Sequence, residues 1–219
     1  MLPPFDPWRS SAIAADVLAA AHAGADALAG RRARRLAELF GAAAGGSAIY
    51  REVLKGRDPA RVRLQDLPIM RKAELMGRFD DWVVDPAIRL DALQRFMADP
   101  ARVAEPFRER YVVWESSGSS GEPGVFVQDA AAMAVYDALE GLRRPQLRPL
   151  QRLFDPWQLR ERVVFVGATG GHFASTVSIE RLRRLNPALA VRLRSVSFLQ
   201  PTARLVAELN ALAPTVVAT

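Results

Sequence analysis

YVVWESSGSSGEPGVFVQD, residues 111 to 129, places a loop of serine and glycine between two apolar runs. The runs Tyr111–Trp114 and Val125–Val127 predict buried strands. In the loop, glycine lets the backbone approach a ligand closely, and successive free N–H groups form a concave nest for anions. Serine hydroxyls add donors that rotate toward phosphate oxygens. The stretch therefore predicts a polyphosphate-binding loop that follows the carboxyl end of a strand.

Two other interpretations of this loop are weaker. A flexible Ser/Gly linker is usually flanked by polar sequence, whereas this loop lies between apolar runs. A Walker loop requires a Gly-Lys-Ser/Thr ending, and the stretch contains no lysine.

The loop resembles the Ser/Thr/Gly-rich phosphate loop of adenylate-forming enzymes, the acyl-CoA synthetase (AMP-binding) superfamily. Its phenylacetate–CoA ligase-like branch is the most similar. The usual family loop reads Ser-Gly-Thr/Ser-Thr/Ser-Gly-Lys-Pro. The residues of this chain that carry the resemblance, and that it implies as the nucleotide phosphate-binding set, are Ser116, Ser117, Gly118, Ser119, Ser120, Gly121, Glu122 and Pro123. Glu122 departs from the family, which commonly has lysine there, and a carboxylate beside a triphosphate is repulsive unless Mg²⁺ or arginine intervenes.

The resemblance implies an ATP-dependent ligase that joins a small-molecule carboxylate to ATP and releases pyrophosphate. The acyl-adenylate then passes its acyl group to a thiol, with coenzyme A as the expected acceptor. ATP and Mg²⁺ are the implied cofactors, with Mg²⁺ held largely by phosphates and water. No catalytic residue is assigned.

The resemblance covers nearly the whole chain but only the first part of such an enzyme. The family's adenine-binding motif, ribose-binding aspartate and catalytic lysine have no match in these residues. The chain is therefore expected to be truncated at its C-terminal end and inactive by itself in ATP–pyrophosphate exchange. A non-catalytic binding or scaffold protein that retains the fold is the alternative.

The predicted fold class is α/β, with a helical N-terminal region (residues 1–105) followed by an α/β nucleotide-binding subdomain (106–219). Alternating strands and helices after residue 160 predict parallel βαβ units. The predicted strands are Val163–Val166, Val191–Val196 and Thr215–Ala218, and the predicted helices are Ser175–Leu185 and Thr202–Leu212. Asp129 is expected to cap a helix that ends at Pro145 and Pro149.

Several helices are predicted before residue 105. One is expected from Ser10 or Ser11 to about Ala29, a second from about Arg32 to Ala44, and a short one from Ser47. The segment Leu67-Pro68 with Lys72 and Leu75 resembles a segment that precedes the catalytic body in the phenylacetate–CoA ligase-like group, and Pro68 is expected to start a helix there. A further helix is predicted at Leu90–Met97.

A second candidate site is Gly170-Gly171-His172, which follows the apolar strand Val163–Val166. Ligands of open α/β sheets bind beyond the carboxyl ends of strands. Both this turn and the phosphate loop follow predicted parallel strands, so we expect them to line one crevice. The resemblance implies that this strand end lines the acyl-substrate pocket, where His172 would orient a carboxylate. The alternative is a Gly-Gly turn with a surface histidine.

Composition excludes some partners and leaves others open. The formal net charge is +6, and the densest basic cluster is Arg31–Arg35. Because the arginines are otherwise spread along the chain and are not interleaved with aromatics, we interpret the cluster as a solvated helix face and expect no nucleic-acid partner. A salt titration would test this. No apolar run approaches the ~20 residues of a membrane span.

The chain has no cysteine, which excludes disulfides and thiolate metal sites and is consistent with a cytoplasmic location. Two histidines give no metal cluster, so no protein-bound metal is predicted. The sequence leaves the oligomeric state open.

Overall fold

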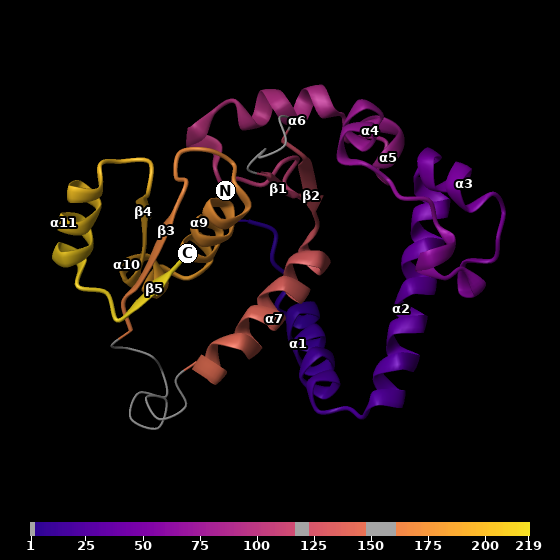
Figure 1. Ribbon diagram of the computed structural model, residues 1–219, viewed down its shortest axis with the longest axis horizontal. Coiled ribbons are helices and arrows are strands. Elements are labelled where there is room, and N and C mark those ends of the chain that lie inside the picture. Colours follow the sequence, from indigo (N-terminus) through magenta and orange to yellow (C-terminus); the bar gives the residue numbers. More distant parts are fainter. Residues whose placement is uncertain (1–2, 117–122, 148–160) are drawn as a thin grey trace. The chain divides into compact units, whose positions relative to one another are not determined.

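The computed structural model of the chain describes residues 3–116, 123–147 and 161–219. It is a mixed α/β structure with a two-stranded antiparallel sheet and a three-stranded parallel sheet (Figure 1). Two compact units can be distinguished. One contains residues 3–18, 96–116 and 125–219, and is called here the α/β unit; the other contains residues 19–95 and is called the helical unit.

The helical unit consists of short helices packed around a small apolar core. Its elements are α2 (Ala25–Gly46), α3 (Ala48–Leu54), the 3-10 turns η1 (Pro59–Arg61) and η2 (Leu64–Asp66), α4 (Lys72–Gly77), α5 (Phe79–Trp82) and the first part of α6 (Leu90–Met97). The core of α2, α3 and the following turn is formed by Phe40, Leu54 and Val62. On α2 the apolar residues Leu36, Phe40 and Ala44 lie four residues apart, so burial of one face explains this helix.

The joint between α2 and α3 is set by Gly46 and Ser47. A Cβ at Gly46 would lie 2.9 Å from the carbonyl oxygen of Val84, so this close approach requires glycine. Ser47 is fully buried. Its hydroxyl accepts the N–H of Tyr50, which caps α3, and donates to the carbonyl of Asp81. The prediction that Ser47 begins a helix is confirmed.

The break between the first two helices differs from the sequence prediction. The helix expected to reach Ala29 ends earlier, because α1 (Pro7–Ala21) stops before Gly24 and α2 starts at Ala25. Gly24 is extended at the N-cap of α2. The alanine-rich sequence gives no apolar periodicity that would have located this break.

Pro68 does not start a helix, contrary to the prediction. The chain is extended at Leu67, and α4 begins only at Lys72. The carboxylate of Glu74 accepts the N–H of Arg71 at 3.3 Å, so a side chain inside the first turn satisfies a terminal N–H group. Local capping therefore decides this boundary rather than the fixed φ angle of proline.

The stretch 111–129 forms strand β1 (Val112–Glu115) and strand β2 (Val125–Gln128), which confirms the two predicted strands. They pair antiparallel, with Trp114 opposite Phe126. The expectation that the strand before the phosphate loop belongs to the parallel sheet is wrong. Its connection to β2 is too short for the crossover that a parallel pair needs, so the two strands form a hairpin.

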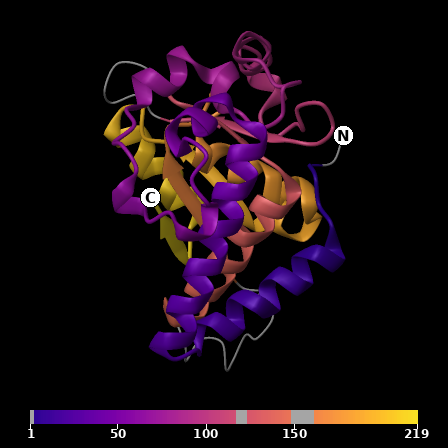
Figure 2. The ribbon, with the colours of Figure 1, turned by 90° about the vertical axis from the view of Figure 1, so that its right-hand side faces the viewer.

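The parallel sheet has the strand order β4-β3-β5, with β3 (Val163–Gly167) between β4 (Leu193–Ser197) and β5 (Val216–Ala218). Helices α9 (Ala174–Leu185) and α10 (Pro187–Arg192) connect β3 to β4, and α11 (Thr202–Leu212) connects β4 to β5. The predicted parallel βαβ units are therefore confirmed. All three helices contact β4, and the orange ribbon of α9 lies beside the sheet in Figure 2.

Helix α7 (Ala130–Leu147) follows β2 and is capped by Asp129, whose carboxylate accepts the N–H of Ala132 at 2.8 Å. The predicted cap is confirmed, but α7 continues through Pro145 to Leu147.

The apolar core of the α/β unit joins β1, α7 and α9. Its buried members are Val103, Ala104, Val112, Trp114, Met133 and Val177, with Phe126 packed against them. Arg181 is 1% exposed, and its Nη1 donates to the carboxylate of Asp137 on α7 at 2.9 Å. Its Nε has no partner among the described residues. An ionised group at this depth requires its counter-charge.

No helix in the described part of the chain is long and apolar enough to cross a membrane.

We predict that Asp137→Ala destabilises the protein by about 2 kcal/mol, because it leaves the buried Arg181 guanidinium uncompensated. Glu180→Ala is the matched control. It removes the same charge from the Arg183–Glu180 pair, whose side chains are 26% and 30% exposed, and should cost less than about 1 kcal/mol. Urea unfolding of both variants measures the difference. Equal losses would mean that the Arg181–Asp137 pair contributes no more than a surface pair.

Candidate functional site

The phosphate loop begins where β1 ends. Ser116 is half-buried directly after Glu115, and Pro123 is exposed shortly before β2. The predicted phosphate-binding residues between them, Ser117 to Glu122, lie outside the described residues. The position of the loop's two ends nevertheless follows from the hairpin, because Glu115 pairs with Val125.

The second predicted site follows β3. Gly170 is exposed and has φ = +108°, a conformation that favours glycine, while Gly171 is half-buried. The hydroxyl of Thr176 donates to the carbonyl of Ala168 at 2.9 Å and ties the turn to the first turn of α9. A Cβ built at Gly171 would lie 3.6 Å from a carboxylate oxygen of Glu115. The turn thus passes close to the end of β1.

A backbone hydrogen bond joins the two predicted sites. The N–H of Glu115 donates to the carbonyl of His172 at 2.8 Å, and Glu115 forms an isolated parallel bridge with Phe173. The start of the phosphate loop and the Gly170-Gly171-His172 turn therefore lie side by side, although β1 and β3 belong to different sheets. We call this place, formed by Glu115, Ser116 and residues 168–173, the strand-end junction.

The N-terminus of α9 opens onto the strand-end junction. Its N-cap is Phe173, which provides no side-chain cap, and Ala174 and Ser175 are exposed. The first N–H groups of a helix carry partial positive charge and bind anions well. The hydroxyl residues Thr169 and Ser175 lie on either side of the turn. The junction thus offers backbone N–H donors and hydroxyls, together with one carboxylate from Glu115.

The His172 side chain points into the protein rather than toward a ligand. It is 1% exposed and packs against the ring of Phe96, with centroids 5.6 Å apart. Phe96 in turn contacts Phe107 and lies under the Arg102 guanidinium, 4.2 Å from its ring centroid. Neither ring nitrogen of His172 makes a hydrogen bond of good geometry to the described residues. What His172 contributes to the strand-end junction is its backbone carbonyl, which accepts the N–H of Glu115.

Burial lowers the pKa of His172 from its ordinary value of 6.5. The nearby carbonyls of Arg102 and Met97 and the carboxylate of Glu115 oppose this effect, and the charge of Arg102 adds to it. Desolvation is the largest cause, so the imidazole is neutral at pH 7.

Sequence reasoning missed the aromatic cluster around His172 and the Arg181–Asp137 pair. The burial of Arg181 could have been predicted, because Arg181 lies four residues after Val177 and therefore on the same face of α9. The aromatic cluster could not have been predicted, because only the tertiary fold brings the distant Phe96, Phe107 and His172 together.

Within the part of the chain that the structure describes, no group of three or more His, Asp or Glu side chains is arranged to hold a metal ion. Comparisons with protein-family models, with curated protein sequences and with solved structures find no match for this chain.

We predict that the protein loses stability on acidification through His172. Because its pKa is lowered in the folded state, the unfolded chain takes up the proton at higher pH. The free energy of unfolding therefore falls as the pH drops below about 6.5, by up to ~1.4 kcal/mol per pH unit for this one proton, until the folded pKa is reached. Urea unfolding between pH 7 and 5 measures the slope.

His172→Leu should remove this part of the slope, whereas His22→Gln, which changes the chain's other, exposed histidine, should leave it intact. The comparison uses slopes rather than absolute stabilities, so a destabilised variant remains informative. The same slope in the His172→Leu protein as in the unmodified one would disprove the assignment.

Proposed function

We propose that this chain is the N-terminal part of an ATP-dependent, adenylate-forming carboxylate ligase of the phenylacetate–CoA ligase-like type. The observation that carries the proposal is the strand-end junction. The end of β1, from which the Ser/Gly loop starts, meets the glycine turn through the Glu115–His172 hydrogen bond, next to the N-terminus of α9. A loop that binds polyphosphate and a pocket that binds a carboxylate must be neighbours in such an enzyme, because their ligands react with each other.

The proposed reaction forms one bond and breaks one in its first step. A carboxylate oxygen of the substrate attacks the α-phosphorus of ATP, and the bond to the β,γ-pyrophosphate breaks. In the second step the thiol of coenzyme A displaces AMP and gives the thioester. The chain's own contribution is electrostatic and positional: N–H groups of the loop and of α9, with serine hydroxyls, hold the departing phosphates in line.

The residues present fit a Mg²⁺-bound nucleotide better than the free one. Glu115 places a carboxylate beside Gly171, and Glu122 adds a second one within the loop sequence. Two carboxylates repel a polyphosphate unless a cation lies between them. Mg²⁺, which accepts oxygen ligands from both phosphates and carboxylates, would remove this repulsion. Coenzyme A remains the proposed acceptor, and the turn at Gly170 and Gly171 the proposed border of the carboxylate pocket.

A second candidate function is a binding protein that holds a phosphate-bearing ligand without activating a carboxylate. The burial of the His172 side chain favours it, because the imidazole is turned away from the junction and is not placed to orient a substrate. Both candidates include binding of MgATP. Pyrophosphate release that depends on an added carboxylate separates them in a longer protein that supplies the missing adenine, ribose and lysine motifs, since only the ligase produces it and these 219 residues are expected to be inactive alone.

We predict that Glu122→Lys strengthens MgATP binding several-fold, because a cation replaces a carboxylate beside the phosphates. Charges a few ångströms apart interact by roughly 4 kcal/mol at an effective dielectric of 20, and solvent and Mg²⁺ reduce this to about 1 kcal/mol. Calorimetric titration at two salt concentrations measures the affinity, and the gain should shrink at the higher one. A parallel titration with EDTA in place of Mg²⁺ should show much weaker binding.

Glu38→Lys is the matched control, because it makes the same charge change on the exposed surface of α2. It should leave the affinity within about twofold. Equal affinities for the Glu122→Lys protein and the unmodified one would mean that Glu122 does not face the phosphates, and absence of any MgATP binding would contradict both candidate functions.

A further inference from the structure

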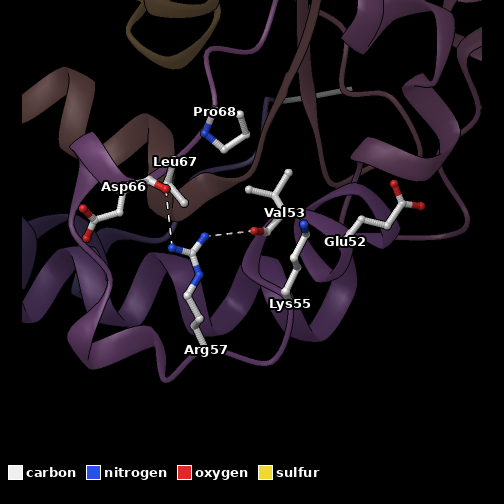
Figure 3. Close-up of a pocket in the computed structure, with 7 residues that line it drawn as sticks. All are labelled: Glu52, Val53, Lys55, Arg57, Asp66, Leu67 and Pro68. Atoms are coloured by element: carbon white, nitrogen blue, oxygen red, sulfur yellow. Dashed lines mark hydrogen bonds between the residues drawn. The ribbon is translucent and has the colours of Figure 1, made fainter.

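The helical unit contains an open pocket of about 710 Å³ between the end of α3 and the segment that follows η2 (Figure 3). It is lined by Glu52 and Val53 of α3, by Lys55 and Arg57 of the following turn, and by residues 66–68. Its volume lies in the range of small-molecule sites, which is about 300–1,000 Å³.

Arg57 shapes the pocket without being available to a ligand. Its guanidinium donates to the carbonyls of Leu54 and Val53 at 3.1 and 3.0 Å, and to the carbonyl of Asp66 at 3.4 Å. These bonds satisfy the C-terminal carbonyls of α3 and tie the segment after η2 to the helix end. The two walls are thus held together by one side chain before any ligand binds.

The two carboxylates of the pocket are also occupied. Arg78 donates to both carboxylate oxygens of Glu52 at 2.9 and 2.8 Å, and these hydrogen bonds lower the pKa of Glu52. Arg63 makes the corresponding two bonds to Asp66 and lowers its pKa in the same way. In Figure 3 the carboxylates of Glu52 and Asp66 point to opposite sides of the pocket, and Lys55 and Arg57 lie between them.

Lys55 is the remaining charged group. It lies at the C-cap of α3 in the left-handed conformation, with φ = +49°. Among the described residues none forms an ion pair with its ammonium, although arginine–carboxylate pairs surround the pocket. Lys55 is also one of only two lysines in a chain whose other basic residues are all arginine. Val53, Leu67 and Pro68 provide apolar surface beside it.

We propose that this pocket binds a small organic monocarboxylate with an apolar body, whose carboxylate pairs with Lys55 and whose body packs on Val53, Leu67 and Pro68. A single ammonium matches a single negative charge. A multiply charged phosphate would meet the carbonyl end of α3 and no free arginine fork, which disfavours it. The site lies in the helical unit and is independent of the nucleotide function proposed above.

The test is a titration of the ¹⁵N-labelled full chain with hexanoate, followed by amide chemical shifts. We expect saturable shifts at Val53, Lys55 and Leu67 with a dissociation constant in the millimolar range or below, ~1 mM corresponding to a weak small-molecule site. Hexanoate should bind more tightly than butyrate, by roughly threefold per CH₂ group. Lys55→Gln should weaken hexanoate binding about fivefold, the value of a solvent-exposed ion pair.

Lys72→Gln is the matched control, since it removes the same charge from the chain's other lysine and should leave hexanoate affinity within about twofold. Hexan-1-ol tests the need for charge and should bind more weakly than hexanoate. The proposal is overturned by absence of saturable shifts, by unchanged hexanoate affinity in the Lys55→Gln protein, or by equal binding of hexan-1-ol. MgATP affinity should not respond to Lys55→Gln, so failure here is distinguishable from failure of the nucleotide function.

Discussion

The hydrogen bond between the N–H of Glu115 and the carbonyl of His172 connects the two sheets of the α/β unit. A backbone hydrogen bond contributes only about 1 kcal/mol net, but leaving both groups unpaired in the interior would cost more. The bond therefore matters mainly as a geometric constraint. It requires the glycine turn after β3 to run beside β1, and this brings the two candidate ligand-binding segments together.

The same constraint places His172 in the core. Because its backbone pairs with Glu115, its side chain is directed against Phe96 and becomes a neutral, buried ring. Arg181 is equally buried and forms an ion pair with Asp137. The unit thus contains two polar side chains at the same depth, one kept neutral by desolvation and the other neutralised by a carboxylate. This difference follows from the intrinsic pKa values of imidazole and guanidinium.

In the helical unit, arginines replace a large apolar core as the means of fixing loops. Arg57 closes the end of α3, Arg78 links α3 to α5 through Glu52 and Asp81, and Arg63 caps its own turn through Asp66. Guanidinium groups suit this task because they donate several hydrogen bonds in a fixed plane. Lysine lacks that geometry, and among the described residues no carboxylate forms an ion pair with Lys55 beside the pocket.

Local sequence determined the elements with strong periodicity or clear caps. α6 and α11 begin and end at the predicted residues, β3 and β5 follow from their apolar runs, and Asp129 and Ser47 cap their helices as expected. The strand predicted at Val191–Val196 starts only at Leu193, because Val191 and Arg192 belong to helix α10. These features depend on residues within a few positions of one another, so the chain encodes them directly. The break between α1 and α2 has no comparable signal in its alanine-rich sequence.

The tertiary structure alone decided what depends on residues far apart in the chain. Pairing of β1 with β2 rather than with the parallel sheet, the burial of His172 against Phe96 and the Arg181–Asp137 pair all join distant segments. The sequence located the Ser/Gly loop and the Gly170–His172 turn as candidate sites and expected them to be neighbours. It could not predict that the imidazole faces inward, because the ring packs against Phe96, which is far from His172 in the sequence.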